Sequence, residues 1–365
     1  MKKEDLAVSF TWEKHMRPIW KGGNVYEETA MFVGETGECT LVFIPKGKVF
    51  VRNYTLDTMY EEGKDYVITG RTIRRVEGSA IPYIAFDAYY LKEMATYDIG
   101  VDNSYAEIPL EGKRYLAYGE KSTFTCRQIS LSYVTDEQLD FSQEQEKVFS
   151  DLIEKWQTEK RGSVLFYGDS ITVGCNASGC VYGGELPPYT PSWVDITGEL
   201  LKRVSNADLE IVNNAVGGWN AGNGVQALEE RVTYRPFDLM VLAFGMNDCW
   251  TDIEVWRKQM RVIADGYFAK NPNGYLLFVS TMMPNRLSTW RGQHEAQEAV
   301  LAELKKEYPN AGLARVSSAF LTVEKTGKRT RDLLANNINH PNDFGVRLYA
   351  QTIGATLVGE ENLIK

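Results

Sequence analysis

The sequence predicts two structural parts: an N-terminal all-β sandwich of jelly-roll type, followed by a three-layer α/β domain with a parallel sheet. Three observations lead to this fold class. The chain has 365 residues, which is long for a single hydrophobic core, and 44% of them are hydrophobic, as in a globular protein. As far as residue 135, short β-like runs follow one another with weak helical periodicity. After residue 160, strand-like and helix-like segments alternate.

The first part is placed at residues 1–140, where turn-forming or charged residues separate a series of β-like runs. These runs span residues 40–44, 48–54, 66–74, 83–90, 115–118 and 123–134. Within the last run, residues 128–134 alternate between polar and apolar side chains, which is the period of a strand with one solvated face. Two antiparallel sheets that bury their apolar faces against each other predict a sandwich.

Residues 141–160 are predicted to form a linking helix, because apolar side chains recur on one helical face. These side chains are Val148, Phe149, Leu152, Ile153 and Trp156. The α/β domain then covers residues 161–365. Its expected strands are 163–167, 209–213, 239–244, 275–281 and 312–316, and its expected helices are 192–204, 224–233, 253–269, 295–308 and 343–358. This alternation predicts right-handed crossovers and a parallel sheet with helices on both faces.

A candidate nucleophile follows the first of these strands. The apolar run 163–167 is broken by Gly168-Asp169-Ser170, which is turn chemistry at the point where a parallel strand would end. Sites of open α/β sheets form at such strand ends. A serine on a tight turn that enters a helix can present its hydroxyl beside backbone N–H groups, as an acyl-transfer nucleophile requires. The alternative is a turn whose serine or aspartate only caps the next helix.

A serine nucleophile needs a base, and the chain has 3 histidines. His15 lies in the N-terminal arm, and His294 begins a polar helix, where we expect a solvated surface histidine. His340 lies in the loop directly before the last helix and is followed by Pro341, which fixes the backbone there. His340 is therefore the candidate base; the alternative is a bystander histidine at a helix start.

Two further strand ends supply candidate donors for an oxyanion. Adjacent glycines, Gly217 and Gly218, follow the second strand of the α/β domain and let the backbone turn an N–H toward a ligand. Asn247 follows the third strand and places a side-chain amide at the same edge of the sheet. An ordinary loop role remains the alternative for each residue, but their coincidence with Ser170 and His340 predicts one shared site.

Together these segments resemble the SGNH, or GDSL-type, hydrolases over residues 161–365. Gly168-Asp169-Ser170, Gly218, Gly245-Met246-Asn247-Asp248 and His340-Pro341 match the four blocks of that family in the family's order. The resemblance implies a flavodoxin-like α/β/α domain without a metal or organic cofactor. It also implies that Ser170 is the nucleophile and His340 the general base, and that the oxyanion hole consists of the Ser170 N–H, the Gly218 N–H and the Asn247 side chain.

One position departs from the family pattern. The family usually has Asp three residues before the catalytic His, and here Asn337 stands there. An amide cannot stabilise an imidazolium as a carboxylate does, and the Asp-to-Asn change in a serine protease triad lowers turnover by roughly 10⁴. Either a backbone carbonyl or water holds the ring of a Ser-His dyad, or another carboxylate takes over. Asp332 and Asp343 are the nearby candidates.

The composition of the chain limits the classes of partner and substrate that fit it. Lys and Arg total 40 against 49 Asp and Glu, a net charge of -9, which disfavours nucleic acid or an anionic membrane surface and favours a neutral or sugar-like substrate. The chain as given begins without the apolar core of a signal peptide, which predicts a cytoplasmic protein; a secreted chain whose signal peptide had been trimmed would look the same. The sequence leaves the oligomeric state open, including a homo-oligomer.

The 5 cysteines are scattered and odd in number, which favours free thiols over a disulfide framework. Cys175 and Cys180 lie near Ser170, but the chain has no Cys-x-x-Cys motif and few histidines, so no metal site is expected.

The two-part arrangement resembles esterases that join an N-terminal β-sandwich to an SGNH domain and remove acetyl groups from sugars. Aromatic residues near the four blocks suit sugar rings or acyl chains, although core packing is an equal alternative for each. They are Tyr182, Tyr189, Trp193, Trp219 and Trp250. The leading hypothesis is a serine esterase that acts on small O-acyl groups, chiefly acetyl, of a sugar or glycan through an acyl-enzyme. The alternatives are a lipase-like or thioesterase-like hydrolase of longer acyl chains, and a non-catalytic carbohydrate-binding protein on an SGNH scaffold.

Overall fold

The computed structural model describes residues 1–93 and 114–365. Its centre is a 5-stranded sheet in the order β11-β10-β12-β13-β14, and all of its strand pairs are parallel. The strands are β10 (Arg161–Gly168), β11 (Asp208–Asn213), β12 (Leu239–Ala243), β13 (Tyr275–Val279) and β14 (Ala311–Ala314). The order places the first strand inside the sheet and the second at its edge, as in flavodoxin-like folds. The predicted α/β/α fold class is confirmed.

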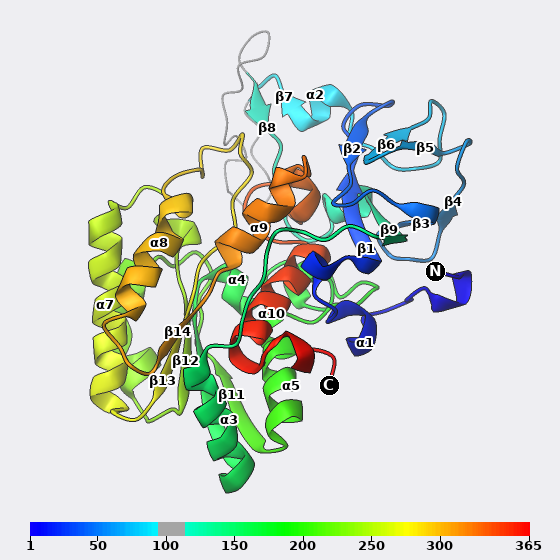
Figure 1. Ribbon diagram of the computed structural model, residues 1–365. Coiled ribbons are helices and arrows are strands. Elements are labelled where there is room, and N and C mark those ends of the chain that lie inside the picture. Colours follow the sequence, from blue (N-terminus) through cyan, green and yellow to red (C-terminus); the bar gives the residue numbers. More distant parts are fainter. Residues whose placement is uncertain (94–113) are drawn as a thin grey trace.

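Helices cover both faces of this sheet (Figure 1). One layer contains α3 (Lys147–Glu159), α5 (Trp193–Ser205), α9 (Val316–Lys325) and α10 (Asp343–Val358), and the other contains α6 (Ala221–Gln226), α7 (Ile253–Lys270) and α8 (His294–Lys305). Successive side chains of a strand point to opposite faces. Accordingly, Val164 and Phe166 of β10 pack with the first layer, and Leu165 and Tyr167 pack with the second.

Two of the expected segments of the α/β part differ in the structure. Helix α9 was not predicted, although its buried side chains Val316, Ala319, Phe320 and Val323 recur at helical spacing. The helix expected over 224–233 is two pieces, α6 and a π-helical turn at Glu229–Thr233. Gly224 explains the close packing of α6, because an added Cβ would lie 2.8 Å from the Phe244 ring.

The N-terminal β region contains antiparallel sheets. One has the order β1-β9-β3-β4 and another has the order β2-β6-β5. Their strands are β1 (Gly23–Met31), β2 (Glu38–Thr40), β3 (Lys46–Asn53), β4 (Met59–Tyr60), β5 (Tyr66–Thr69), β6 (Thr72–Arg75) and β9 (Gln128–Thr135), and a short pair is formed by β7 (Tyr90–Leu91) and β8 (Tyr115–Leu116). The β-rich character predicted for this region is confirmed.

Individual strands of this region were harder to predict. β1 was not expected, because Glu27 and Glu28 interrupt its apolar pattern; both are buried and paired, with Arg52 and Lys328 respectively. The run 66–74 is a hairpin of two strands. Most of 83–90 is not a strand, since α2 (Phe86–Tyr89) occupies its second half.

The N-terminal β region packs directly on the last helix, α10. Arg347 of α10 donates hydrogen bonds to the backbone oxygens of Tyr26 (2.8 Å) and Glu27 (2.9 Å). Gln351, one turn later, donates to the backbone oxygens of His15 and Arg17, both at 2.7 Å. One hydrophobic core therefore contains side chains of β1, β3 and β9 together with those of α5, α9 and α10. The predicted linking helix, α3, lies on the parallel sheet against α5 and α10.

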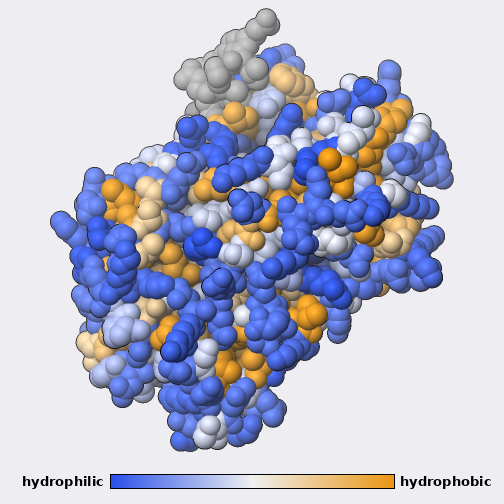
Figure 2. All heavy atoms as spheres, viewed as in Figure 1, coloured by the Kyte–Doolittle hydropathy of each residue, from blue (hydrophilic) through white to orange (hydrophobic). Residues whose placement is uncertain are grey.

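The surface in Figure 2 is mainly hydrophilic, and its hydrophobic residues form small separate groups on this face. None of the helices in the described residues is long and apolar enough to cross a membrane. All five cysteines are free thiols.

Candidate active site

The turn after β10 is built so that Ser170 begins a helix at the carboxyl edge of the sheet. Gly168 ends the strand, and an added Cβ there would lie 2.3 Å from Thr172 Oγ1 and 2.5 Å from the Ala243 oxygen. Asp169 caps the short helix α4 (Ser170–Val173) by accepting a hydrogen bond from the Ile171 N–H at 2.9 Å. Because Asp169 is the cap, the Ser170 hydroxyl is not needed for that task. From β10 the chain first adds β11 on one side and then continues with β12 on the other side, so the strand order changes direction at β10. Open α/β sheets form their sites at such a switch point.

The structure brings Ser170 and His340 together. Ser170 Oγ lies 2.8 Å from His340 Nε2, and both side chains are largely buried. Asn336 holds the loop that carries His340, because its Oδ1 accepts hydrogen bonds from the backbone N–H groups of Ile338, Asn339 and His340, all at 3.0 Å. These three hydrogen bonds fix the backbone of the loop that places the imidazole next to Ser170.

Asn176 binds the other nitrogen of the ring, with its Oδ1 at 2.6 Å from His340 Nδ1. The Asn176 Nδ2 group donates to the backbone oxygens of Lys121 and Tyr182, both at 3.4 Å, so the amide oxygen must be the atom that faces the ring. This assigns the proton of the imidazole to Nδ1. Nε2 is then left to accept the hydrogen of the Ser170 hydroxyl, which is the tautomer that a general base requires.

A carboxylate from the N-terminal β region also lies beside the ring. Glu120 Oε2 is 3.4 Å from His340 Nδ1, while Oε1 accepts hydrogen bonds from Tyr118 and, at 3.1 Å, from Asn336 Nδ2. Burial alone would raise the pKa of Glu120, but the interactions with His340, Tyr118 and Asn336 outweigh it and lower the pKa to about 2. Glu120 is therefore ionised at neutral pH and places a negative charge next to Nδ1.

The two carboxylates expected near His340 are not at the ring, so these candidates are wrong. Asp332 accepts a hydrogen bond from the Met31 N–H at 2.9 Å, and Asp343 accepts one from the Ser178 N–H at 2.9 Å. Each carboxylate satisfies a buried backbone group instead. Asn337 is also engaged elsewhere: its Nδ2 donates to the Ala117 oxygen at 2.7 Å, and its Oδ1 accepts from the Tyr89 hydroxyl at 2.9 Å.

The glycine loop lies against the serine. Val216 N–H donates to the Gly168 oxygen at 3.1 Å, and a Cβ added to Gly217 would lie 3.9 Å from the Ser170 Cβ. Gly218 has φ +79, a conformation that favours glycine.

The loop after β12 is tied to the glycine loop. Asn247 Nδ2 donates to the Trp219 oxygen at 2.8 Å, and the Asp248 carboxylate accepts from the Ala221 N–H at 3.1 and 3.2 Å. Burial raises the pKa of Asp248 to about 7 and that of Asp169 to about 6. Both carboxyl groups are buried acceptors that shape turns. The segments that carry Ser170, Gly218, Asn247 and His340 thus meet at one edge of the sheet.

The other two histidines have structural surroundings. His294 is buried, not solvated as expected: its Nε2 lies 3.1 Å from the Met246 oxygen, and burial lowers its pKa. Trp290 Nε1 donates to the same oxygen at 3.0 Å, so both side chains pack behind the turn that presents Asn247. His15 is buried in the N-terminal β region, with Nε2 2.7 Å from Glu27 Oε2.

The aromatic candidates divide into core and surface residues. Trp193 is fully buried, and its Nε1 donates to the Ile171 oxygen at 2.8 Å, so it stabilises the turn that carries Ser170 from within the core. Tyr182 is 57% exposed, Tyr189 55% and Trp250 68%. The backbone oxygen of Tyr182 accepts a hydrogen bond from Asn176, and Trp250, three residues after Asn247, packs against Trp290 at a centroid distance of 5.4 Å. Two exposed aromatic residues thus belong to segments that adjoin Asn176 and Asn247.

Within residues 1–93 and 114–365, no group of three or more His, Cys, Asp or Glu side chains is arranged to hold a metal ion. Burial raises the pKa of Cys175 to about 12 and that of Cys180 to about 11, so both stay protonated thiols.

Sequence reasoning missed both residues that contact His340 Nδ1. Asn176 lies six residues after Ser170, close enough that a search for acceptors around the nucleophile could have included it. Glu120 lies in the other structural part, and no spacing or motif relates it to His340. Only the fold identifies it.

The sequence profile of the GDSL-like Lipase/Acylhydrolase family matches residues 166–348, half of the chain. A search of curated proteins gave no match.

Similar solved structures include three esterases or hydrolases. A mutant of Axe2, an acetyl-xylooligosaccharide esterase from Geobacillus, is 20% identical, with 54% of this chain and 94% of that chain covered and a TM-score of 0.44. A two-domain esterase (CEX) active on acetylated mannans, co-crystallized with mannopentaose, is 19% identical, with coverage of 58% and 52% and a TM-score of 0.46. LAE5, an alpha/beta hydrolase from the metagenome of Lake Arreo, Spain, is 19% identical, with coverage of 55% and 96% and a TM-score of 0.42. The match thus spans about half the length of the two-domain esterase.

Proposed function

Because this chain belongs to the GDSL-like lipase/acylhydrolase family, and is thus a carboxylic ester hydrolase, we propose that it removes small O-acyl groups, chiefly acetyl, from a sugar or glycan. The observation that carries the proposal is the contact of 2.8 Å between Ser170 Oγ and His340 Nε2, in the tautomer fixed by Asn176. Ser170 is the nucleophile and His340 the general base. Asn176 and Glu120 are positioning residues that act through the imidazole.

In the first half of the reaction, His340 Nε2 takes the proton of the Ser170 hydroxyl as Oγ attacks the ester carbonyl. The Ser170 N–H, the Gly218 N–H and an N–H of the Asn247 side chain stabilise the negative charge on the carbonyl oxygen. The imidazolium that forms is stabilised by the Glu120 carboxylate 3.4 Å from Nδ1. His340 then returns its proton to the sugar oxygen, which leaves as an alcohol, and the acyl group stays on Ser170.

In the second half, a water molecule attacks the acyl-enzyme. His340 Nε2 takes a proton from this water and later gives it to Ser170 Oγ, so the acid is released and the serine is restored. Both halves use the same oxyanion donors, because the charge develops on the same carbonyl oxygen.

Two observations support a small acyl group on a sugar. Ser170 is 6% exposed and His340 is 8% exposed, so little space is open to solvent around the reacting atoms, which favours a short acyl group over a long chain. Tyr182 and Trp250 are exposed, belong to the segments that adjoin Asn176 and Asn247, and offer flat apolar faces of the kind that sugar rings pack against.

The test is hydrolysis of p-nitrophenyl acetate, butyrate and octanoate by the chain and by its Ser170→Ala variant, followed by acetate release from an acetylated oligosaccharide. We expect turnover to depend on Ser170 and to be fastest for acetate. Preference for octanoate would favour a hydrolase of longer acyl chains. Turnover that survives Ser170→Ala, or no turnover of any ester, would refute the proposed mechanism; glycan binding without turnover would then indicate a carbohydrate-binding protein.

A further inference from the structure

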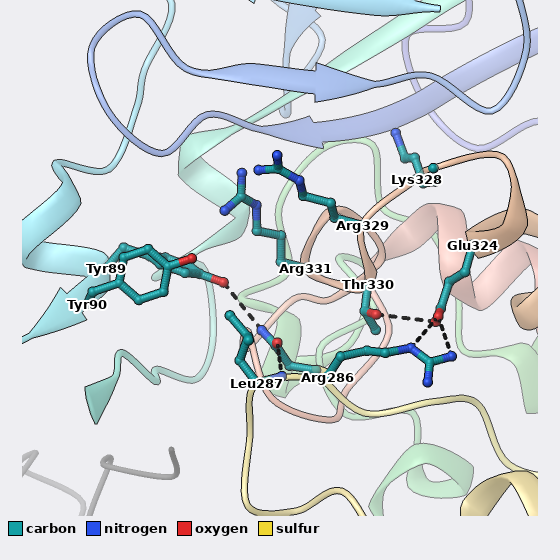
Figure 3. A pocket seen from close by; sticks show the side chains of 11 residues that line it. Tyr89, Tyr90, Arg286, Leu287, Glu324, Lys328, Arg329, Thr330 and Arg331 are labelled. Carbon is teal, nitrogen blue, oxygen red and sulfur yellow. Dashed lines mark hydrogen bonds and ion pairs between the residues drawn. The ribbon is translucent and has the colours of Figure 1, made fainter. Parts of the chain in front are cut away.

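A cavity lies between the N-terminal β region and the loop that precedes the His340 loop (Figure 3). Its volume is about 480 Å³, within the range of small-molecule sites. Tyr89 and Tyr90 line it from the β region, and Arg286, Arg329 and Arg331 line it from the α/β part. The two tyrosine rings are perpendicular, with centroids 4.7 Å apart.

Three arginines line this cavity, but carboxylates neutralise one of them. Arg286 forms ion pairs with Glu295 at 2.6 Å and with Glu324 at 2.7 Å. Figure 3 shows this guanidinium directed toward Glu324, away from the two tyrosines. Arg286 therefore closes one wall of the cavity and adds little free charge to it.

Arg331 differs from Arg286. It is 7% exposed, and its buried Nε has no hydrogen-bond partner in the part of the chain that the structure describes. Among the residues that the structure describes, its guanidinium forms no ion pair, and its contact is with the face of the Tyr89 ring at 5.4 Å from the centroid. A buried guanidinium is normally paired, because removing it from water costs more than ring contact returns.

Burial alone would lower the pKa of Arg331, but the charges around it, that of Asp332 first, outweigh burial and raise the pKa, although Arg331 and Asp332 form no ion pair. The Asp332 carboxylate accepts from the Met31 N–H at 2.9 Å, and Glu28 is paired with Lys328 at 2.6 Å. Arg329, two residues before Arg331, is exposed and likewise forms no ion pair with any described residue. Both arginine side chains extend to the same side of the cavity in Figure 3. The cavity thus has an aromatic wall and two cationic groups that form no ion pair with any residue the structure describes.

We propose that this cavity binds the anionic group of a sugar-sized ligand, a carboxylate or a phosphate, through Arg329 and Arg331, with the ring of the ligand against Tyr90. The guanidinium fork matches both anions in geometry. That the ligand is a sugar rests on the proposed function, whereas the anionic group follows from the two arginines alone.

The position of the cavity relates it to the esterase site. The Tyr89 hydroxyl donates to Asn337 Oδ1 at 2.9 Å, and Asn285, which also lines the cavity, donates to the Asn337 oxygen at 2.8 Å. Asn337 is three residues before His340. The cavity therefore adjoins the back of the His340 loop, and neither Ser170 nor His340 lines it.

The test is isothermal titration calorimetry of the full chain with glucuronate, glucose 6-phosphate, glucose and inorganic phosphate. At least one of the two anionic sugars should bind more tightly than glucose and inorganic phosphate, by about tenfold or more for a charge-assisted contact. Arg329→Gln and Arg331→Gln should each weaken that binding by about tenfold. Arg74→Gln, which removes an exposed charge from the β5–β6 hairpin, should leave it unchanged.

Equal affinity for glucose and for both anionic sugars would overturn the inference, as would no binding at all. So would binding of phosphate alone, or binding that neither arginine variant weakens. Because Arg331 is buried, its variant is first checked for folding by circular dichroism. If that variant does not fold, the calorimetry of Arg329→Gln, which changes an exposed residue, is the test. Hydrolysis of p-nitrophenyl acetate by the same preparations separates the two proposals: turnover without sugar binding refutes this inference only, and binding without turnover refutes the proposed function only.

Discussion

Glu120→Gln tests whether the N-terminal β region contributes to the chemistry. The substitution keeps the size of the side chain and removes its charge. At 3.4 Å from His340 Nδ1, a full charge on the ring would interact with the carboxylate by about 5 kcal/mol at an effective dielectric constant of about 20, and by about 1 kcal/mol in bulk water. The imidazolium forms only as the reaction proceeds. The interaction therefore stabilises the transition state and raises kcat, and it does not contribute to substrate binding.

Glu120 is partly buried, so the effect should lie between these limits. A barrier raised by about 1 to 5 kcal/mol lowers kcat by about 5-fold to several thousandfold. We expect about 100-fold, since Asn176 still accepts the Nδ1 proton in the variant. KM should change little.

The assay is steady-state hydrolysis of p-nitrophenyl acetate, with thermal unfolding at neutral pH as a check on the fold. Glu38→Gln is the matched control, because Glu38 is an exposed glutamate of the same β region. If folded Glu120→Gln keeps kcat within about threefold of the unmodified chain, the carboxylate does not stabilise the imidazolium and the reasoning fails. A rise in KM with unchanged kcat would also refute it, by indicating a role in substrate binding.

Three further predictions concern the same site. Asn176→Ala removes the acceptor that fixes the Nδ1–H tautomer, so kcat should fall by about 10²-fold in the ester assay; an unchanged kcat would show that Glu120 alone orients the ring. Asn247→Ala removes a proposed oxyanion donor and should lower kcat by about 10²–10³-fold with little change in KM, whereas a loss confined to KM would place Asn247 outside the oxyanion hole. The folded pKa of Glu120, about 2, lies below the ordinary 4.5, so the ionised group stabilises the folded state above about pH 4.5, and this contribution is lost as the pH falls through 2. Urea unfolding between pH 4.5 and 2 should therefore show a smaller loss of stability in Glu120→Gln than in the unmodified chain, by at most about 3 kcal/mol, and parallel curves would contradict the lowered pKa.

The parallel sheet could be predicted because each of its strands is a local feature. β10 is a continuous apolar run closed by Gly168, and the polar residues that follow such strands must gather at one edge of the sheet. This is why Ser170 and Asn247 could be named as candidates from sequence, whereas His340 was named because it is the one of 3 histidines that lies in the loop before the last helix. The structure then places the segments that carry them side by side.

Features that depend on distant partners could not be predicted. β1 carries two buried glutamates, and its strand character is visible only once Lys328 is known to neutralise Glu28. His294 looks like a surface residue in its polar helix, but the Met246 oxygen gives it a buried partner. Glu120 is separated from His340 by most of the chain, and the two meet only because the β region packs on the α/β part. In each case the missing information was a long-range contact.

Long-range contacts also explain why Asn337 stands where the family usually has an aspartate. Asn337 both donates, to the Ala117 oxygen at 2.7 Å, and accepts, from Tyr89 at 2.9 Å and from Asn285 at 3.1 Å. A carboxylate could accept the latter two bonds but would face the Ala117 oxygen without a hydrogen to give it. Asn337→Asp should therefore not raise kcat, although it restores the family pattern.

Asn337→Asp should instead destabilise the fold by about 1–3 kcal/mol, the cost of a buried acceptor set against another acceptor. Ester hydrolysis and urea unfolding of this variant, compared with the unmodified chain, check both statements. An increase in kcat would mean that residue 337 can reach the imidazole after all, and that Glu120 is not the carboxylate of this site. An unchanged kcat with lower stability would place the orienting charge in the β region, where the position of Glu120 puts it.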